Sequence, residues 1–583
     1  MRIGLLTEGG CPYASGEARR WRDRLVRGLT SHEFEIYALG RGPGDGGEGA
    51  PDRVRAVRTA PLYGELSGAL RWRPGRRAVV RGRRARRRFA ECYGDLAAGF
   101  AVTRTAGGQA DRFAAGLYGL AALARDHGDL PELLRSEQAV RLLETACRAP
   151  GALRAAHGAR VGDLLAVSEE LERTLRPLSL DWYGGAAGTC AAGGAVAPAG
   201  LAAVDLCHAT AGGAAALPGL LAKRFFGTPL LLTEYGVRLR EHYLAGSGST
   251  LSAPVRALLG AFENALAQET YAQAALITPG NAHTRRWQEH CGADRARLRT
   301  VHPGMDADAF TAVPDAAADL SKTLVWTGTV DADKDLVSLL HAFARVHRAE
   351  PDATLRVVGA AGPGREDRAY LAHCRALAAQ LFPDEAADAL SAGDNPVSFE
   401  ETGGPGLPCP EDAYAAGSVL VLSSVVEGFP RSLVEAMFSG RATVSTDAGA
   451  VCEIIGGTGL VVPPRNPRAL ADACLELLRD PGRRARLGAA ARARALELFT
   501  VEQNVAAFRG IYLELISHTP AGAGPAPAGA PRLFARPAES HVPGRWAVAR
   551  GARQAAPPTG RAPSWAEPAT AGAGPVRPRG ARP

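Results

Sequence analysis

Hydrophobic residues in this chain fall in short runs that alternate with longer amphipathic stretches. Apolar runs of this length are typical of buried parallel strands, and a spacing near 3.6 residues is typical of helices. In the first half, the pattern predicts helices at 17–28 and 216–226 and Ala-rich helices through much of 95–180. Strands are predicted there at 3–7, 34–39, 204–208, 229–233, 274–278 and 298–302.

The second half repeats the alternation. Strands are predicted at 323–327, 354–359, 397–399, 419–422 and 442–445. Helices are predicted at 336–347, 367–381, 410–417, 431–438 and 466–480. Alternating strands and helices imply a doubly wound parallel sheet, and 583 residues are too many for one core. The sequence therefore predicts two α/β domains, residues 1–315 and 321–496.

Two carboxylates follow the predicted strand 419–422. Glu427 lies in the turn after this strand, and Glu435 lies eight residues later on the predicted helix. Ligands of open α/β sheets bind at the carboxyl ends of the strands. Carboxylates accept hydrogen bonds from vicinal hydroxyls, and a helix N-terminus suits a phosphate. The alternative is a surface helix with two solvated glutamates.

The stretch EGFPRSLVEAM, from Glu427 to Met437, resembles the E-x7-E signature of family 4 retaining glycosyltransferases. The resemblance implies the GT-B fold, in which two Rossmann-like domains face each other across a cleft. It implies that Glu427 contacts hydroxyls of the donor sugar and that Glu435 holds the nucleotide ribose. The other implied donor-binding residues of this stretch are Gly428, Phe429, Ser432 and Leu433.

In the family, the stretch that corresponds to TLVWTGTVDADKDL, residues 323–336, binds the donor diphosphate. Members of the family commonly read G-R-x4-K here; Gly328 and Lys334 fit this pattern, but Thr329 replaces the Arg. A hydroxyl does not replace a bidentate, permanently charged guanidinium. The chain has only three lysines among its 68 basic residues, so a Lys at this position is notable, although an ordinary surface Lys is the alternative. The resemblance implies that Glu427 and Lys334 are catalytic.

In the first half, the pattern DLCHAT, LLLTEYG, ITPGN and VHPGMD resembles the N-terminal domain of Pel-type exopolysaccharide glycosyltransferases. The familiar form there is TEHG, whereas this chain has Tyr235 after Glu234. Candidates for the acceptor side are Gly16, His208 and Glu234, with a neutral structural role equally open for His208. A dinucleotide fingerprint is excluded, because no G-x-G-x-x-G opens the first helix.

Charge is concentrated in two regions. Residues 519–583 hold nine Arg and two Glu, which account for +7 of the net charge of +8. Because the rest of the chain is near neutral, a basic nucleic-acid-binding domain is excluded. Thirteen of these 65 residues are Pro, so a disordered tail is predicted. Residues 71–88 contain ten Arg, which leaves two interpretations open. One is contact with an anionic partner, such as a membrane surface, nucleic acid or charged polymer, and the other is a solvated basic helix.

Ten scattered cysteines form no C-x2-C or C-x4-C pair, so zinc is not expected. The resemblance to retaining GT-B enzymes implies that no metal is needed and that the nucleotide-sugar is a co-substrate rather than a cofactor. The N-terminus has no apolar signal region and the chain no long apolar run, so a cytoplasmic protein is predicted. Residues 497–518 are predicted to form a terminal helix with a Thr500 and Gln503 capping box. In the GT-B fold such a helix crosses back to the first domain.

The predicted function is that of a retaining glycosyltransferase. It would move a sugar from a nucleotide-diphosphate donor, with UDP-glucose as the first guess, to a hydroxyl of a glycan or lipid-linked acceptor in polysaccharide or envelope synthesis. The alternative is a degenerate, non-catalytic sugar- or nucleotide-binding partner in a polysaccharide assembly. Four residues depart from the family pattern and favour this alternative: Thr329, Tyr235, Ser15 and Ala450. Glu427, Glu435 and Lys334 disfavour it.

Overall fold

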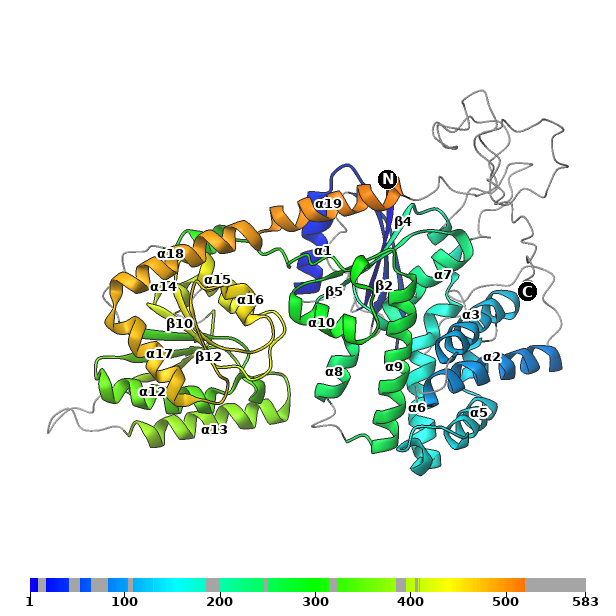
Figure 1. The fold of residues 1–583 in the computed structure, drawn as a ribbon, viewed down its shortest axis with the longest axis horizontal. Coiled ribbons are helices and arrows are strands. Elements are labelled where there is room, and N and C mark those ends of the chain that lie inside the picture. Colours follow the sequence, from blue (N-terminus) through cyan, green and yellow to red (C-terminus); the bar gives the residue numbers. More distant parts are fainter. Residues whose placement is uncertain are drawn as a thin grey trace, which may run out of the picture. The chain divides into compact units, whose positions relative to one another are not determined.

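The computed structural model describes residues 1–8, 17–40, 53–63, 82–102, 108–128, 130–184, 200–245, 250–313, 322–383, 395–403, 407 and 409–518. Within these ranges lie two six-stranded sheets (Figure 1). The first contains β1 (Arg2–Glu8), β2 (Glu33–Gly40), β3 (Val54–Pro61), β4 (Leu206–Ala209), β5 (Leu230–Glu234) and β6 (Leu276–Pro279). The second contains β7 (Thr323–Thr327), β8 (Thr354–Val358), β9 (Val397–Glu400), β10 (Val419–Leu422), β11 (Ala442–Thr446) and β12 (Leu460–Val462).

All strand pairs in both sheets are parallel. The strand orders are β3-β2-β1-β4-β5-β6 and β12-β11-β10-β7-β8-β9. Each sheet therefore reverses its winding once, between β1 and β4 in the first and between β7 and β10 in the second. Such a reversal is where open α/β sheets bind their ligands. The predicted pair of doubly wound domains is confirmed for the described residues.

The first sheet is buried on both faces. Along β1, Ile3 and Leu5 belong to one core and Leu6 to the other, as expected when successive side chains point to opposite faces. The helices of this half are α1 (Glu17–Gly28), α2 (Arg83–Ala101), α3 (Gln109–His127), α4 (Leu130–Leu134), α5 (Glu137–Arg148), α6 (Val161–Leu175), α7 (Leu217–Phe226), α8 (Arg238–Ala245), α9 (Ala253–Gln273) and α10 (Ala282–His290).

The second sheet shows the same alternation along β10. Val419 and Val421 pack into one core, and Leu420 and Leu422 pack into the other. The helices of this half are α11 (Asp308–Thr311), α12 (Leu336–Ala349), α13 (Arg365–Leu381), α14 (Pro410–Ala415), α15 (Arg431–Phe438), α16 (Val451–Ile455) and α17 (Pro467–Arg479). The bounds of β10 and α15 are those predicted from the sequence.

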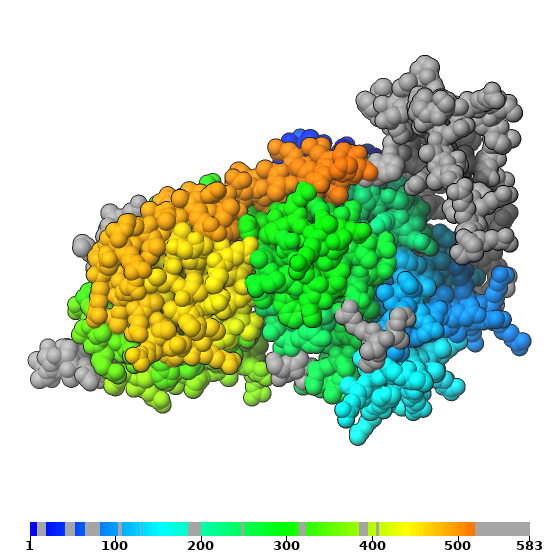
Figure 2. Space-filling model, in the orientation of Figure 1, coloured from blue at the N-terminus to red at the C-terminus, as the bar shows by residue number. Residues whose placement is uncertain are grey.

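Two last helices lie end to end along the molecule, orange in Figures 1 and 2. Helix α18 (Pro481–Leu498) packs into a core of the second domain through Ala491 and Ala495. Helix α19 (Val501–Ser517) instead joins the core between β1 and α1, with Phe508 and Tyr512 fully buried there. The Thr500 hydroxyl accepts the Gln503 N–H at 3.4 Å and caps α19. The chain thus returns to the first domain after completing the second.

Two details of the strand prediction were wrong. Residues 298–302 form no strand. They contact β6 through one isolated bridge, Leu298 to Ile277, and through the Arg299 and Val301 N–H groups, which donate to the Ile277 and Pro279 carbonyls. The edge strands β3 and β12 were not predicted. In β3 exposed residues alternate with partly buried ones and include an arginine of each kind, and β12 has only three residues after a Gly-rich turn, so neither offers a clear apolar run.

Several sequence predictions fall outside the described residues, namely those for Gly16, for residues 71–81 of the Arg-rich segment and for residues 519–583. The described end of the Arg-rich segment opens α2. Four of its side chains are exposed: Arg83, Arg84, Arg86 and Arg87. Arg87 pairs with Glu91 at 3.0 Å, and Arg88 pairs with Asp126 at 3.0 Å. Over the described part of the chain, no helix has both the length and the apolar character that crossing a membrane requires.

Candidate active site

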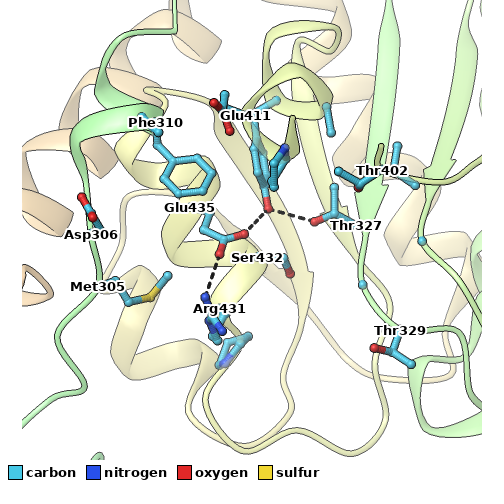
Figure 3. A pocket seen from close by; sticks show the side chains of 18 of the residues that line it. Met305, Asp306, Phe310, Thr327, Thr329, Thr402, Glu411, Arg431, Ser432 and Glu435 are labelled. Atoms are coloured by element: carbon cyan, nitrogen blue, oxygen red, sulfur yellow. Dashed lines mark hydrogen bonds and ion pairs between the residues drawn. The ribbon is translucent and has the colours of Figure 1, made fainter. Parts of the chain in front are cut away.

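A cavity of about 950 Å³ lies where the second sheet reverses its winding. Thr327, Gly328 and Thr329 reach it from the end of β7, and Val358 and Gly359 reach it from the end of β8. The loop after β10 and the first turns of α15 close another side (Figure 3). The cavity is thus at the carboxyl edge of the sheet, where the sequence predicted a ligand.

Close backbone contacts hold the loops around this cavity together. A Cβ on Gly359 would lie 1.8 Å from the Gly328 carbonyl oxygen, so only glycine fits there. The Gly328 N–H donates to the Val358 carbonyl at 3.1 Å. The Ser423 hydroxyl donates to the Lys334 carbonyl at 2.7 Å, which ties the loop after β10 to the loop after β7.

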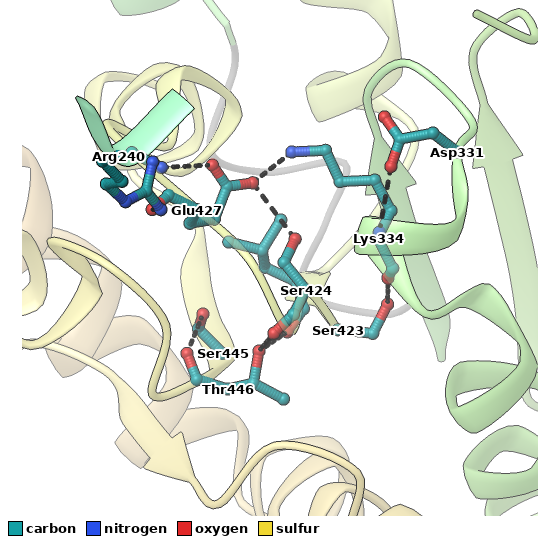
Figure 4. A network of polar contacts seen from close by, with 10 residues as sticks. Arg240, Asp331, Lys334, Ser423, Ser424, Glu427, Ser445 and Thr446 are labelled. Atoms are coloured by element: carbon teal, nitrogen blue, oxygen red, sulfur yellow. Dashed lines mark hydrogen bonds and ion pairs between the residues drawn. The ribbon is translucent and has the colours of Figure 1, made fainter. Parts of the chain in front are cut away.

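Glu427 and Lys334 meet at the centre of a polar network (Figure 4). The Lys334 ammonium donates to Glu427 Oε1, which also accepts the Ser424 hydroxyl at 3.1 Å. The Gly428 N–H donates to Glu427 Oε2 at 3.3 Å, and the Arg240 guanidinium of α8 donates to the Glu427 carbonyl at 2.8 Å. With 8% of its surface exposed, Glu427 is a fixed carboxylate that faces a cation.

Glu435 is held by a second set of bonds (Figure 3). The buried Tyr414 hydroxyl donates to Glu435 Oε2 at 2.7 Å, and the Thr327 hydroxyl lies 3.0 Å from the same phenol oxygen. Burial and the Glu435 charge raise the pKa of Tyr414 far above its usual value, so this phenol remains a donor. Arg431 approaches Glu435 Oε1 at 3.4 Å from one turn earlier in α15.

The N-terminus of α15 borders the cavity, which Pro430, Arg431 and Ser432 line. Pro430 precedes the helix and provides no side-chain cap, in contrast to Asp335 before α12 and Asn466 before α17. The first N–H groups of a helix have no partner inside the helix, and the helix dipole makes this end positive. Together with the Ser432 hydroxyl they form a suitable site for an anionic oxygen.

The structure places seven of the predicted donor residues on this cavity: Gly328, Thr329, Lys334, Glu427, Phe429, Ser432 and Glu435. Gly428 adjoins it through its bond to Glu427. Leu433 differs from the prediction, because its side chain is fully buried in the core with Met437 and Phe438. A Leu two residues into an amphipathic helix lies on the apolar face, away from the ligand.

Other residues of the cavity were missed in the sequence. They come from α1, from the segment around α11 and from α14, which are far from the signature in the chain; they include Arg20, Arg24, Met305, Asp306, Asp308, Phe310, Glu411 and Tyr414. Asp306 and Asp308 are exposed residues that line the cavity. No local motif marks these residues, since only the fold brings them to the site.

The prediction that His208 lines an acceptor wall needs correction. Its ring is completely buried beneath α19, with Nδ1 2.7 Å from the Tyr512 hydroxyl and Nε2 2.7 Å from the Thr233 hydroxyl. Burial lowers the pKa of His208 to about 3, so the ring is neutral. The alternative interpretation, a structural histidine, agrees with this position.

Glu234 is also inside the first domain and does not line the described cavity. It accepts the Tyr271 hydroxyl at 2.7 Å and the Gln288 amide at 3.0 Å, and burial raises its pKa to about 7. Tyr235 was expected at a cleft position. It is partly buried, and its ring packs edge-on against Trp21 at 5.7 Å.

Comparison with protein families matches both halves of the chain separately. Residues 321–480 match the family described as "Glycosyl transferases group 1". Residues 1–157 and 193–296 match the family described as "Domain of unknown function (DUF3492)". The segment with Glu427, Glu435 and Lys334 therefore lies within the glycosyltransferase match.

Curated relatives and solved structures agree with this assignment. A D-inositol 3-phosphate glycosyltransferase of Kineococcus radiotolerans is 29% identical over 248 residues, which are 38% of this chain and 52% of the relative. One of Streptomyces bingchenggensis is 28% identical over 241 residues, which are 39% of this chain and 49% of the relative. The chain thus spans about half the length of each.

The fold comparison covers more of the chain. Sucrose-phosphate synthase of Thermosynechococcus elongatus superposes with a TM-score of 0.51 at 16% identity, over 88% of this chain and 99% of that chain. At this identity the similarity concerns the fold alone. The chain therefore carries a group 1 glycosyltransferase domain, at residues 321–480, within a two-domain fold of the GT-B type.

Proposed function

We propose that this protein is a retaining glycosyltransferase that moves a sugar from a nucleotide-diphosphate donor to a hydroxyl acceptor. The observation that carries the proposal is the convergence of Glu427, Lys334, Glu435 and the uncapped start of α15 on one cavity. A nucleotide-sugar needs these groups in this combination: acceptors for its sugar and ribose hydroxyls, and donors for its diphosphate.

In the proposed reaction, the bond between the sugar C1 and the diphosphate oxygen breaks, and the diphosphate leaves with the electron pair. The acceptor oxygen forms the new bond to C1 on the same face and transfers its proton to the leaving diphosphate oxygen. Lys334 and the N–H groups that open α15 stabilise the charge that develops on the leaving diphosphate. Glu427 orients the sugar, and Glu435 holds the ribose. No metal is part of this proposal.

The resemblance of the sequence also suggests which donor and which product this enzyme would have. UDP-glucose is the first candidate donor, and a polysaccharide or envelope glycan is the candidate product, as the family 4 and Pel-type resemblance suggests. The curated relatives are named for D-inositol 3-phosphate, so a small polyol phosphate belongs in the acceptor panel beside glycans and lipid-linked acceptors.

A non-catalytic, nucleotide-binding partner is the competing proposal. It rests on Thr329, which leaves the cavity without a guanidinium at this position. The two proposals differ in turnover: the enzyme releases nucleoside diphosphate from its donor in the presence of an acceptor, and a binding partner does not.

The experiment is calorimetric titration of the full chain with UDP, GDP and ADP and with their glucose conjugates. We expect selective binding of one diphosphate, which Lys334→Ala weakens about 10- to 100-fold by removing a charge-assisted contact. Lys322→Ala is the matched control, because this half-buried Lys pairs with Glu350 at 2.9 Å and does not line the cavity. If the folded protein binds none of these nucleotides, the proposed function is wrong.

For location we propose the cytoplasm, with the exposed arginines at the start of α2 as a contact for anionic membrane surfaces. Cosedimentation with phosphatidylserine vesicles tests this contact. Cosedimentation that is lost at high salt supports this contact. If the same fraction of protein sediments with neutral phosphatidylcholine vesicles, the contact is contradicted.

A further inference from the structure

We infer that Arg431 binds the donor diphosphate and takes the place of the cation that Thr329 lacks. This inference rests on the proposed function and assigns a residue that the sequence signature did not mark. Arg431 is the first residue of α15, and its half-buried side chain lines the cavity together with Thr329 (Figure 3).

The position of Arg431 relative to Glu435 gives the direction of the nucleotide. The two residues are four positions apart on one face of α15, which separates their backbones by about 6 Å along the axis. A nucleotide whose ribose meets Glu435 places its phosphates toward the positive end of the helix, because the uncapped N–H groups are there. On this path Arg431 is the side chain that stands one turn beyond the ribose.

The charges around the cavity call for a second cation. Among the described residues of the second domain, Lys334 and Arg431 are the cationic side chains that line it. The Lys334 ammonium is already paired with Glu427, and Thr329 is uncharged. Arg20 and Arg24 line the same cavity from α1 of the first domain. A diphosphate carries at least two negative charges, so one shared ammonium leaves it poorly balanced on the side of the second domain.

Arginine suits this position better than lysine would. Its planar guanidinium has five N–H donors, so one edge can remain near Glu435 Oε1, at 3.4 Å, while other donors bind phosphate oxygens. The same group can therefore contact the carboxylate that holds the ribose and the phosphate next to it. Lysine offers a point charge without this fork.

The test compares Arg431→Gln with the native chain by calorimetric titration. The probes are the nucleoside, its monophosphate and its diphosphate, for whichever of the bases U, G and A the native chain binds. We expect diphosphate affinity to fall about 10- to 100-fold while nucleoside affinity stays unchanged, because only the phosphates lose a partner. Arg468→Gln is the control, since this exposed Arg of α17 lies outside the cavity.

An equal loss of nucleoside and diphosphate affinity would overturn the inference, because Arg431 would then act only by positioning Glu435. Unchanged affinity for both ligands would also overturn it and would leave the proposed function intact. If the native chain binds no nucleotide at all, the proposed function fails, and the inference fails with it.

A second variant tests the link to residue 329. Adding Thr329→Arg to Arg431→Gln returns a guanidinium to the cavity from its other side, at an exposed position where no core is disturbed. We expect this double variant to regain most of the diphosphate affinity. A double variant that binds diphosphate no better than Arg431→Gln would contradict the idea that Arg431 stands in for a cation at 329.

Discussion

At the scale of single residues, the Tyr414 hydroxyl is the group that fixes Glu435. It donates to Glu435 Oε2 at 2.7 Å from a buried position between Thr327 and Phe310. Tyr414→Phe keeps the ring and removes this bond. We expect the affinity for a ribonucleoside diphosphate to fall about 5- to 10-fold, since one hydrogen bond to a charged group is lost.

A nucleotide without ribose hydroxyls tests whether the loss of affinity arises at the ribose. A 2′,3′-dideoxy nucleoside diphosphate has no hydroxyls for Glu435, so its affinity should be the same for the native chain and for Tyr414→Phe. Tyr370→Phe is the control, because this tyrosine of α13 accepts the Val337 N–H of α12 at 3.4 Å and lies outside the cavity. A loss of equal size for both nucleotides would mean that Tyr414 acts on folding rather than on the ribose site.

Glu427 gives a second prediction at this scale. Glu427→Gln keeps the shape of the side chain but removes the negative charge that faces Lys334. We expect kcat to fall about 100-fold or more, as for the loss of one group that acts in the transition state, with little change in nucleoside diphosphate affinity. The assay is release of nucleoside diphosphate with an acceptor that the native enzyme uses. Full turnover in this variant would remove Glu427 from the reaction.

At the scale of elements, His208 joins β4 to α19 through Tyr512 and also bonds Thr233 on β5. Its pKa is lowered to about 3 by burial, whereas a histidine in the unfolded chain titrates near 6.5. The unfolded state therefore gains the proton first, and the free energy of unfolding falls as the pH drops below about 6.5. At pH 5 this costs about 2 kcal/mol.

The variant His208→Gln tests this dependence, because an amide can keep both bonds and does not titrate. We expect its free energy of unfolding to fall about 2 kcal/mol less than that of the native chain between pH 7.5 and pH 5. The measurement is urea unfolding at both pH values. His341→Gln, at an exposed position of α12, should change nothing. If the free energy of unfolding of His208→Gln depends on pH as strongly as that of the native chain, groups other than His208 cause the dependence.

At the scale of the whole molecule, the charge is divided unevenly. Residues 519–583 carry +7 of the net +8, so a chain that ends at residue 518 is close to neutral. We expect this shorter chain to elute from a cation exchanger at clearly lower salt than the full chain. Its nucleoside diphosphate affinity should be unchanged, since the cavity is lined by residues between Arg20 and Glu435. Lost nucleotide binding would give the tail a role in the site.

Features that depend on residues close together in the sequence could be predicted, and features that depend on contacts between distant segments could not. The unit from β10 to β11 was predicted closely, because an apolar run, a turn and an amphipathic helix are local patterns. The edge strands β3 and β12 were missed, because their pairing partners, not their own sequences, make them strands. Residues 298–302 have strand-like composition, but they add only one isolated bridge and two backbone hydrogen bonds to the edge of β6, too few for a strand.

The sequence by itself determined the two doubly wound sheets, the place of the site after β10, and the set of Glu427, Glu435 and Lys334, because these depend on hydrophobic period and on one short signature. Only the tertiary structure decided that His208 and Glu234 are interior groups, and that Tyr414 and Arg431 flank the same carboxylate. Burial and hydrogen-bond partners come from segments far apart in the chain, so no local pattern encodes them.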